Sequence, residues 1–166
     1  MIWTNQGSIP VTQDLWGVKY LTSQKIIAVG TGGTIIRSTD DGVTWTSLWS
    51  QSATNFWAVS FPDSMHGVVV GDSGIVLTTT DGGTSWTKII VNPSASFYSV
   101  SFTDPNTGTV VGDSGRIYRT TNGTTFTAQT SGTIDELNGV KFFDTNHGSI
   151  ASSDSGIYTT TNGGAS

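Results

Sequence analysis

Short apolar runs separated by turn-forming residues follow one another along the whole chain. Residues 97–102 alternate, with Tyr98, Val100 and Phe102 on one side and serines on the other, which is the two-residue period of a β-strand. The next run, residues 109–112, indicates a strand buried on both faces. Two further strands are predicted at residues 116–121 and 125–129. No segment shows the period of a helix, so the pattern predicts an all-β chain.

This set of four strands occurs four times. First strands are predicted to begin near Leu15, Phe56, Phe97 and Leu137. Each set contains a box of Ser or Thr, Asp or Asn, and Gly, which an aromatic residue completes in the first three sets. The Asp or Asn stands at positions 40, 81, 122 and 162. The steps are 41, 41 and 40 residues, a period typical of propellers and solenoids. The box residues are Asp40, Gly42, Trp45, Asp81, Gly83, Trp86, Asn122, Phe126 and Asn162.

The residue types of the box are those of a tight turn. Asp or Asn accepts hydrogen bonds from the backbone N–H groups that follow it. Gly supplies a positive φ, and the aromatic residue covers the hairpin with an apolar surface. We therefore expect the box to be structural.

The first strands predict how the repeats stack. One face is large, as in Trp57, Val59 and Phe61, and the other is small, as in Ala58 and Ser60. We expect each large face to nest on the small face of the next repeat, as in radially packed four-stranded blades.

The chain is predicted to be a single β-propeller domain over residues 1–166. Blades are expected at residues 15–50, 56–91, 97–130 and 137–166, and the last lacks its own outer strand. Trp3-Thr4 matches the aromatic-Thr pair that starts each fourth strand. Residues 1–8 are therefore predicted to be the outer strand that closes the last blade, which would remove an exposed edge.

Closure can take place within one chain or between chains. A ring of four blades lies within the known range of propellers. Two chains that exchange ends would instead form an eight-bladed dimer with two-fold symmetry. We favour the homodimer, because bulky first-strand aromatics would crowd the narrow hub of a four-bladed ring.

Composition excludes several classes of partner. Lys and Arg total 7 and the net charge is −5, which argues against nucleic acid. Cys is absent, so no disulfide or thiolate metal site is expected. No apolar run approaches the ~20 residues of a membrane span, and no signal peptide is expected at the start. We expect neither a metal nor a cofactor.

Three patterns resemble catalytic or metal sites, and each has a structural explanation. Gly71-Asp72-Ser73-Gly74 is similar to the surroundings of a serine nucleophile, but it recurs near residue 113 at the same predicted turn. His66 and His147 occupy equivalent turns, which favours a turn role. A sialidase-type site would need converging Arg side chains and a Glu, whereas the available residues are Arg37, Arg116, Arg119 and Glu136. We expect no catalysis.

The best candidate binding surface is the face that carries the turns between second and third strands and the connectors between blades. Variable loops on a rigid scaffold are where binding usually lies. The candidate residues are Asp72, Asp113, Asp154, Arg116 and Trp49.

The box resembles the Asp-box, or BNR, repeat, S/T-x-D-x-G-x-S/T-W. Residues 38–45 and 79–86 match it in full, while Asn122 and Asn162 depart from it. The longer pattern from Val59 to Trp86 is similar to the Ycf48/HCF136-type blade. The resemblance implies a β-propeller. Such propellers include sialidases, other glycosidases, sorting receptors and photosystem assembly factors, so fold alone does not choose among them.

These observations predict a non-catalytic binding or scaffold module that contacts a protein or a glycan through its variable loop face. One alternative is a sialidase-like glycan-processing domain. Another is an engineered or excised propeller fragment that assembles without its own biochemical function. The resemblance favours an extracellular or periplasmic location.

Overall fold

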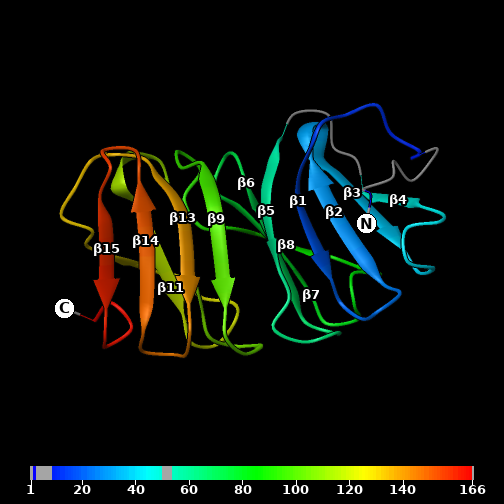
Figure 1. The fold of residues 1–166 in the computed structure, drawn as a ribbon. Helices are drawn as coiled ribbons and strands as arrows, with labels where there is room; N and C mark the ends of the chain where they lie inside the picture. The colour runs from blue at the N-terminus through cyan, green and yellow to red at the C-terminus, as the bar shows by residue number, and fades with distance from the viewer. Residues whose placement is uncertain (1, 3–8, 50–53, 166) are drawn as a thin grey trace.

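The computed structural model describes residues 2, 9–49 and 54–165 of the chain, which form four antiparallel β-sheets (Figure 1). The first strands are β1 (Leu15–Tyr20), β5 (Phe56–Ser60), β9 (Phe97–Phe102) and β13 (Leu137–Phe142). The second strands are β2 (Ile26–Gly30), β6 (Gly67–Gly71), β10 (Gly108–Gly112) and β14 (Gly148–Ser152). The third strands are β3 (Thr34–Ser38), β7 (Ile75–Thr79), β11 (Ile117–Thr120) and β15 (Ile157–Thr160). The fourth strands are β4 (Thr46–Trp49), β8 (Thr87–Ile90) and β12 (Thr127–Gln129).

Each sheet follows the order of the chain, and we number the sheets 1 to 4 in that order. Sheets 1 to 3 have four strands each, and sheet 4 has three, β13-β14-β15, among the described residues. Two 3₁₀ turns, η1 (Thr31–Gly33) and η2 (Asp113–Gly115), join second to third strands in sheets 1 and 3. The predicted all-β fold of four repeated antiparallel sheets is confirmed. Of the predicted closing strand, residues 1 and 3–8, Trp3 among them, lie outside the described residues.

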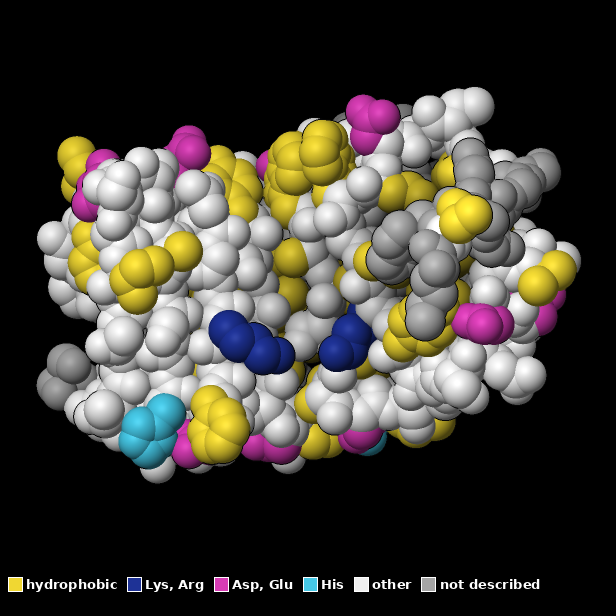
Figure 2. Space-filling model, viewed as in Figure 1, with side chains coloured by type: hydrophobic (Ala, Val, Ile, Leu, Met, Phe, Trp, Pro, Cys, Tyr) yellow, Lys and Arg dark blue, Asp and Glu magenta, His cyan; other side chains and the backbone are white. Residues whose placement is uncertain are grey.

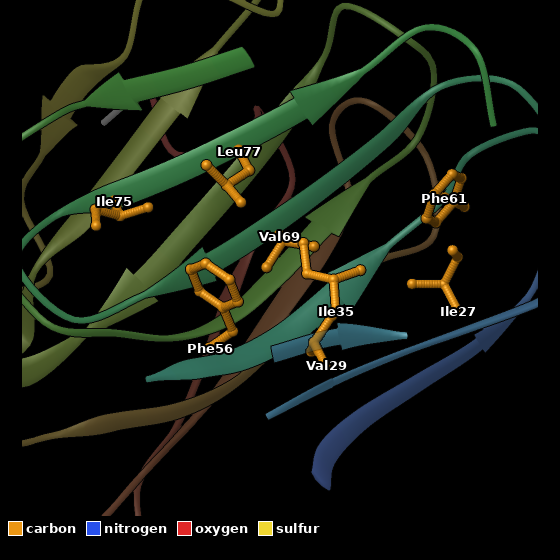
Figure 3. Packing of buried hydrophobic residues seen from close by; sticks show 8 residues of the cluster. All are labelled: Ile27, Val29, Ile35, Phe56, Phe61, Val69, Ile75 and Leu77. Carbon is orange, nitrogen blue, oxygen red and sulfur yellow. The ribbon is translucent and has the colours of Figure 1, made fainter. Parts of the chain in front are cut away.

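The core consists of three apolar layers, one between each pair of neighbouring sheets. Figure 3 shows the first layer, where Ile27, Val29 and Ile35 of sheet 1 lie against Phe56 and Phe61 of sheet 2. The second layer joins sheets 2 and 3, and the third joins sheets 3 and 4. Buried β-branched side chains dominate the second strands β2, β6 and β10, as their sequence predicts, whereas β14 at the end of the stack is only partly buried.

The direction of nesting is opposite to the prediction. Val100 and Phe102, on the large face of β9, pack on Val68 and Val70 of the preceding sheet rather than on the following one. Val140 and Phe142 pack on sheet 3 in the same way. Alternation along a strand defines two faces but does not say which one meets the earlier repeat, so the sequence left this direction open.

Serine hydroxyls on the small faces connect neighbouring sheets. Ser60 Oγ accepts a hydrogen bond of 3.2 Å from the Phe102 N–H, and Ser101 Oγ accepts one of 3.0 Å from the Phe142 N–H. Ser99 Oγ accepts the Val140 N–H at 3.1 Å. These backbone donors belong to the next sheet, so the bonds fix β9 in register with β5, and β13 in register with β9.

The outward faces of sheets 1 and 4 remain exposed where the same repeat positions are buried inside the stack. Val18 on β1 is 67% exposed, whereas its counterparts Val100 and Val140 are each 8% exposed. On β15, Ile157 is 69% exposed, whereas its counterpart Val76 is fully buried. Strands β15 and β4 lie at opposite edges of the molecule (Figure 1). The described residues therefore form a stack with two open ends.

We predict that Ser101→Ala lowers the free energy of unfolding by about 1–3 kcal/mol, because the buried Phe142 N–H loses its acceptor. Urea unfolding monitored by fluorescence measures the change. Ser149→Ala, at an exposed serine of sheet 4, is the control and is expected to stay within about 0.5 kcal/mol. Equal effects of the two substitutions would contradict the role of the inter-sheet bond.

Candidate functional site

Every first strand carries a β-bulge at its second residue. In β5, Phe56 faces Gly71 and Ala58 faces Val70, so Trp57 is the extra residue. The corresponding residues of the other first strands are Trp16, Tyr98 and Asn138. A bulge commonly redirects a side chain. Phe56 joins the core, and Trp57 is left out of the nesting face to which the sequence pattern assigned it.

The bulges place three aromatic side chains side by side. The ring centroids of Trp16 and Trp57 are 5.6 Å apart, and those of Trp57 and Tyr98 are 6.2 Å apart in an edge-to-face arrangement. Trp16 is 55% exposed, and the other two are half-buried. We call Trp16, Trp57 and Tyr98 the aromatic row. Figure 2 shows hydrophobic side chains at the upper edge of the molecule, where the first strands begin.

Acidic groups surround the aromatic row. The Trp57 indole N–H donates to Asp72 Oδ1 at 2.8 Å, and the Asn55 side-chain amide donates to Asp72 Oδ2 at 3.0 Å. Partial burial, together with the negative charges of Glu136, Asp113 and Asp72, raises the pKa of Tyr98 above its usual value. The structure thus brings together Asp72 and Asp113, two of the predicted candidates, with aromatic residues that the sequence analysis had assigned to the core.

Arg116 is the nearby positive group. Its Nη1 forms an ion pair of 2.5 Å with Asp113 Oδ1, and both side chains are partly exposed. Arg116 also lines an open hollow of about 630 Å³, together with the connector that contains Ser131 and Ile134. The net charge around the aromatic row stays negative, since Arg116 offsets only one of the three acids.

Two predicted candidates do not join this site. Asp154 accepts hydrogen bonds from the Ser152 hydroxyl and from the Gly156 N–H, and so stabilises its own turn in sheet 4. Trp49 ends strand β4 and packs against the core layer between sheets 1 and 2, rather than lying in the connector. Strand β4 extends through Trp49, so the connector to sheet 2 begins after this residue.

The Asp-box residues hold their turns by a repeated set of hydrogen bonds. Asp40 accepts the Thr44 N–H at 2.8 Å and the Thr44 hydroxyl at 2.6 Å, and Asp81 accepts the equivalent groups of Ser85. In sheet 3, Asn122 Oδ1 accepts the Thr125 N–H at 2.8 Å. In sheet 4, Asn162 Oδ1 accepts the Ala165 N–H at 3.2 Å.

The remaining box residues complete each turn. Gly42 and Gly83 have positive φ values of 87° and 77°. The Trp45 indole N–H donates to the Gly42 carbonyl at 3.0 Å. Trp86 packs edge-to-face on Phe61, and Phe126 lies against the layer between sheets 2 and 3.

Hydrogen-bond donors lower the pKa of several turn carboxylates. The Thr44 hydroxyl and N–H lower the pKa of Asp40, and the Ser85 hydroxyl and N–H lower that of Asp81. The His147 N–H is the main cause of the pKa of Asp144 falling to about 2. His66 and His147 each donate a backbone N–H to the Asp three residues earlier, so their predicted turn role is confirmed.

The three Arg side chains are held separately. Arg37 donates to Thr84 Oγ1 at 2.8 Å, while Arg119 donates to Thr109 Oγ1 at 2.9 Å and lies over the Phe142 ring. Arg116 pairs with Asp113. Among the described residues, no group of three His, Cys, Asp or Glu side chains could hold a metal ion. Within the same part of the chain, no helix is long and apolar enough to cross a membrane.

Residues 2–166 match the protein-family profile described as photosynthesis system II assembly factor YCF48. The chain belongs to the YCF48 family. The YCF48-type resemblance of its blades is thereby confirmed. A comparison with curated protein sequences gives no match.

Solved structures show the same fold at low sequence identity. "YCF48 bound to D1 peptide" is 24% identical, with a TM-score of 0.76, and the match covers 95% of this chain and 54% of that one. YCF48 from Cyanidioschyzon merolae is 17% identical, with a TM-score of 0.73, and the match covers 91% and 51% of the two chains. This YCF48-family chain therefore spans about half the length of these relatives.

The propeller scaffold is also shared with other proteins. The computationally designed Ika4 protein is 16% identical, with a TM-score of 0.76, over 98% of this chain and 100% of that one. An ancestral GH74 enzyme is 18% identical, with a TM-score of 0.75, over 99% and 25%. These likenesses establish the fold alone.

The depressed carboxylate pKa values predict an acid-sensitive fold. A group whose pKa is lower in the folded chain stabilises it above the unfolded value of about 4, and the stabilisation is lost as pH falls through the folded value. We predict that the free energy of unfolding, measured in urea, falls between pH 4 and about 2, the pKa of Asp144.

Asp40→Asn with Asp81→Asn should make this fall shallower, because neutral Asn oxygens still accept the turn bonds, as Asn122 does. If the free energy of unfolding of the double variant falls with decreasing pH as steeply as that of the unaltered chain, then Asp40 and Asp81 do not cause the acid sensitivity.

Proposed function

We propose that this chain is a non-catalytic propeller module that binds a protein partner at the aromatic row. The main support for this proposal is that the repeated bulges place Trp16, Trp57 and Tyr98 side by side on a rigid stack of sheets. Large amphipathic side chains on a rigid scaffold are typical of protein recognition. The YCF48 structure bound to D1 peptide supports a peptide ligand for this chain as well.

The chemistry around the aromatic row favours a segment that carries Arg or Lys. A cation over the face of Trp or Tyr is attracted by the ring, and an acidic surrounding adds to that attraction. Asp72, Asp113 and Glu136 supply the acidic surrounding. A neutral glycan could stack on the same rings and donate hydroxyl groups to the carboxylates, but it would lack the charge attraction that a cationic side chain gains there.

The separation of the Arg side chains supports a binding role over the sialidase-like alternative. That chemistry would need Arg37, Arg116 and Arg119 to converge on one substrate carboxylate. Instead, Arg37 belongs to sheet 1 and contacts Thr84, while Arg119 contacts Thr109 and Thr145. Hydrolysis of a fluorogenic sialoside, lost in Arg116→Ala, would favour the enzyme.

Binding at the aromatic row can be tested with random short peptides displayed on phage and selected on the intact chain. We expect the selected peptides to be enriched in Arg or Lys and to bind roughly 2- to 30-fold more weakly to Trp16→Ala, as the loss of a cation–aromatic contact implies. Fluorescence anisotropy measures the affinities.

Phe143→Ala is the matched control, because Phe143 is 89% exposed but lies after β13, at the opposite end of the first strand. Equal losses in Trp16→Ala and Phe143→Ala, or no enrichment of basic residues, would contradict the proposal. A glycan that binds in place of the peptides and is lost in Trp16→Ala would replace protein as the ligand class.

We further propose that two copies of the chain associate through the open ends of their stacks, which is the homodimer that the sequence favours. The outward face of sheet 1 carries Leu15, Val18 and Tyr20, at positions that are buried in sheets 3 and 4. The outward face of sheet 4 carries Ile157, at a position that is also buried elsewhere. Each end therefore exposes one half of the interface that repeats inside the stack.

Sedimentation velocity tests this association. We expect the chain to sediment with twice the mass of one copy and Ile157→Glu to reduce it to one copy, because a charge would be buried unpaired. Ile134→Glu is the control, since Ile134 is 87% exposed on a connector. If the unaltered chain sediments with the mass of one copy, the proposed self-association is contradicted.

A further inference from the structure

A cavity of about 250 Å³ lies between sheets 2 and 3, at the end of the molecule where the first strands finish. Its floor is apolar and buried, and it contains Val68 of β6 and Phe102 of β9. Its mouth is formed by turn residues of sheet 3, among them Pro105 and Thr124, which are exposed. We call it the junction cavity, and it lies at the opposite end of the first strands from the aromatic row.

Between sheets 3 and 4, the side chain of Arg119 occupies the corresponding place. Its Cζ lies 4.9 Å from the centroid of the Phe142 ring, and its Nη2 donates to the Thr145 carbonyl oxygen. Its Nη1 donates to Thr109 Oγ1 of its own sheet at 2.9 Å. A guanidinium from sheet 3 therefore rests against an aromatic ring and a turn carbonyl of sheet 4.

Between sheets 1 and 2, the corresponding place also holds cations. Arg37 of sheet 1 donates from Nη1 to Thr84 Oγ1 of sheet 2 at 2.8 Å. A Cβ atom added to Gly82 would lie 2.8 Å from Lys25 Nζ and 2.9 Å from the Ser64 carbonyl oxygen, so this ammonium and this carbonyl lie close to the same point. Side chains of the chain itself thus supply a cation at both of these junctions.

The junction cavity is lined by the residues that correspond to the partners of Arg119. Phe102 has the repeat position of Phe142, and Pro105 has that of Thr145. Both line the cavity. The cavity therefore contains an aromatic ring and a turn carbonyl at the positions that hold a guanidinium at the next junction.

Thr124 supplies a further acceptor at the mouth. The Asn122 side chain accepts the Thr124 N–H, as the Asp81 side chain accepts the Thr84 N–H, so the two threonines have equivalent places in their turns. Thr84 Oγ1 is the acceptor of the bond from Arg37. Thr124 Oγ1 donates to Asn122 Oδ1 at 3.2 Å, and a hydroxyl oxygen that donates can still accept a hydrogen bond.

The cation itself is replaced at this junction. Strand β7 carries Thr78 at the arginine position of sheets 1 and 3, and this short side chain lines the cavity without spanning it. His66 has the repeat position of Lys25, and its Nδ1 lies 2.8 Å from Asp63 Oδ2, so the ring is held against the carboxylate of its own turn. That carboxylate adds a negative charge beside the cavity, which favours a cationic ligand.

We propose that the junction cavity binds the guanidinium of an arginine side chain supplied by a partner protein. The guanidinium lies over the Phe102 ring and donates to the Pro105 carbonyl oxygen and to Thr124 Oγ1, as the arginines of this chain do with the equivalent groups. A guanidinium is planar, stacks on aromatic rings and presents several donors in a fixed geometry, whereas a Lys ammonium is a compact point charge. The cavity therefore prefers Arg to Lys, and the site is independent of the aromatic row.

Titration of the intact, isotopically labelled chain with N-acetyl-arginine methylamide, followed by backbone-amide NMR, tests the site. We expect saturable shifts of the N–H signals of Asn106, Gly123 and Thr124, which line the cavity. One cation–aromatic contact and two hydrogen bonds imply a dissociation constant on the order of millimolar. N-acetyl-lysine methylamide is the matched ligand, and equally large shifts with it would overturn the proposed preference for a guanidinium.

Thr78→Arg supplies the guanidinium from the chain itself. We expect this variant to bind the arginine probe at least about tenfold more weakly, because its own side chain then occupies the cavity, as Arg119 does at the next junction. Thr78→Ser, which leaves the cavity open, is the control and should keep the affinity. Undiminished binding in a folded Thr78→Arg chain would overturn the proposal.

Thr124→Val tests the same site without filling it. We expect roughly tenfold weaker binding of the arginine probe, since a hydrogen bond to a charged group is lost while the shape of the side chain is kept. Thr125→Val is the matched control, because Thr125 is an exposed neighbour in the same turn and is not among the lining residues. Equal affinities of the two variants would overturn the role of Thr124.

The positions of the shifted signals distinguish this inference from the proposed function. Shifts confined to the indole N–H signals of Trp16 and Trp57 would place the arginine probe at the aromatic row. That result would overturn the junction site and would support the proposed function. Shifts confined to the junction cavity would support this inference, and the selected peptides would still test the aromatic row separately.

Discussion

The structure depends on the contact between each first strand and the sheet that precedes it. Large residues such as Val100 and Phe102 lie on the buried valines of the earlier sheet, and apolar burial of this kind is the main favourable term in folding. The serine hydroxyls on the small faces then fix the register of this contact through backbone N–H groups of the next sheet. Every other feature, including the candidate site, takes its position from this repeated interface.

Much of the architecture could be predicted from the sequence, because periodicity reports backbone alternation directly. The starts of the first strands at Leu15, Phe56, Phe97 and Leu137 agree with the structure. The box of Asp40 and Asp81 was interpreted from the hydrogen-bonding capacity of its residues, and the bonds to Thr44 and Ser85 have that form. Local chemistry of this kind acts over a few residues and is visible in a single repeat.

The features that sequence reasoning missed depend on contacts between segments. A bulge at Trp57 interrupts the two-residue alternation, and no residue within the strand marks it. The partial signal is across the sheet, where a Cβ on Gly71 would lie 2.1 Å from the Asn55 carbonyl oxygen. Trp49 was misplaced for a related reason, since the length of β4 depends on its pairing with Ile35. The predicted face contains Asp72 and Asp113, but the sequence analysis did not place the aromatic row beside them.

The serine that joins neighbouring sheets is not present in every repeat. Ser60 and Ser101 hold this position in sheets 2 and 3, but Lys19 and Lys141 hold it in sheets 1 and 4. In a stack where each repeat contacts only its neighbours, total stability is approximately a sum of junction terms, and cooperativity can fail at the weakest junction. Sheets 2 and 3 each provide a serine hydroxyl that binds the first strand of the following sheet. The junction of sheets 2 and 3 and that of sheets 3 and 4 are therefore expected to be the most stable part of the stack. Sheet 1, whose lysine cannot accept such a bond, would then be the unit that separates and rejoins most readily.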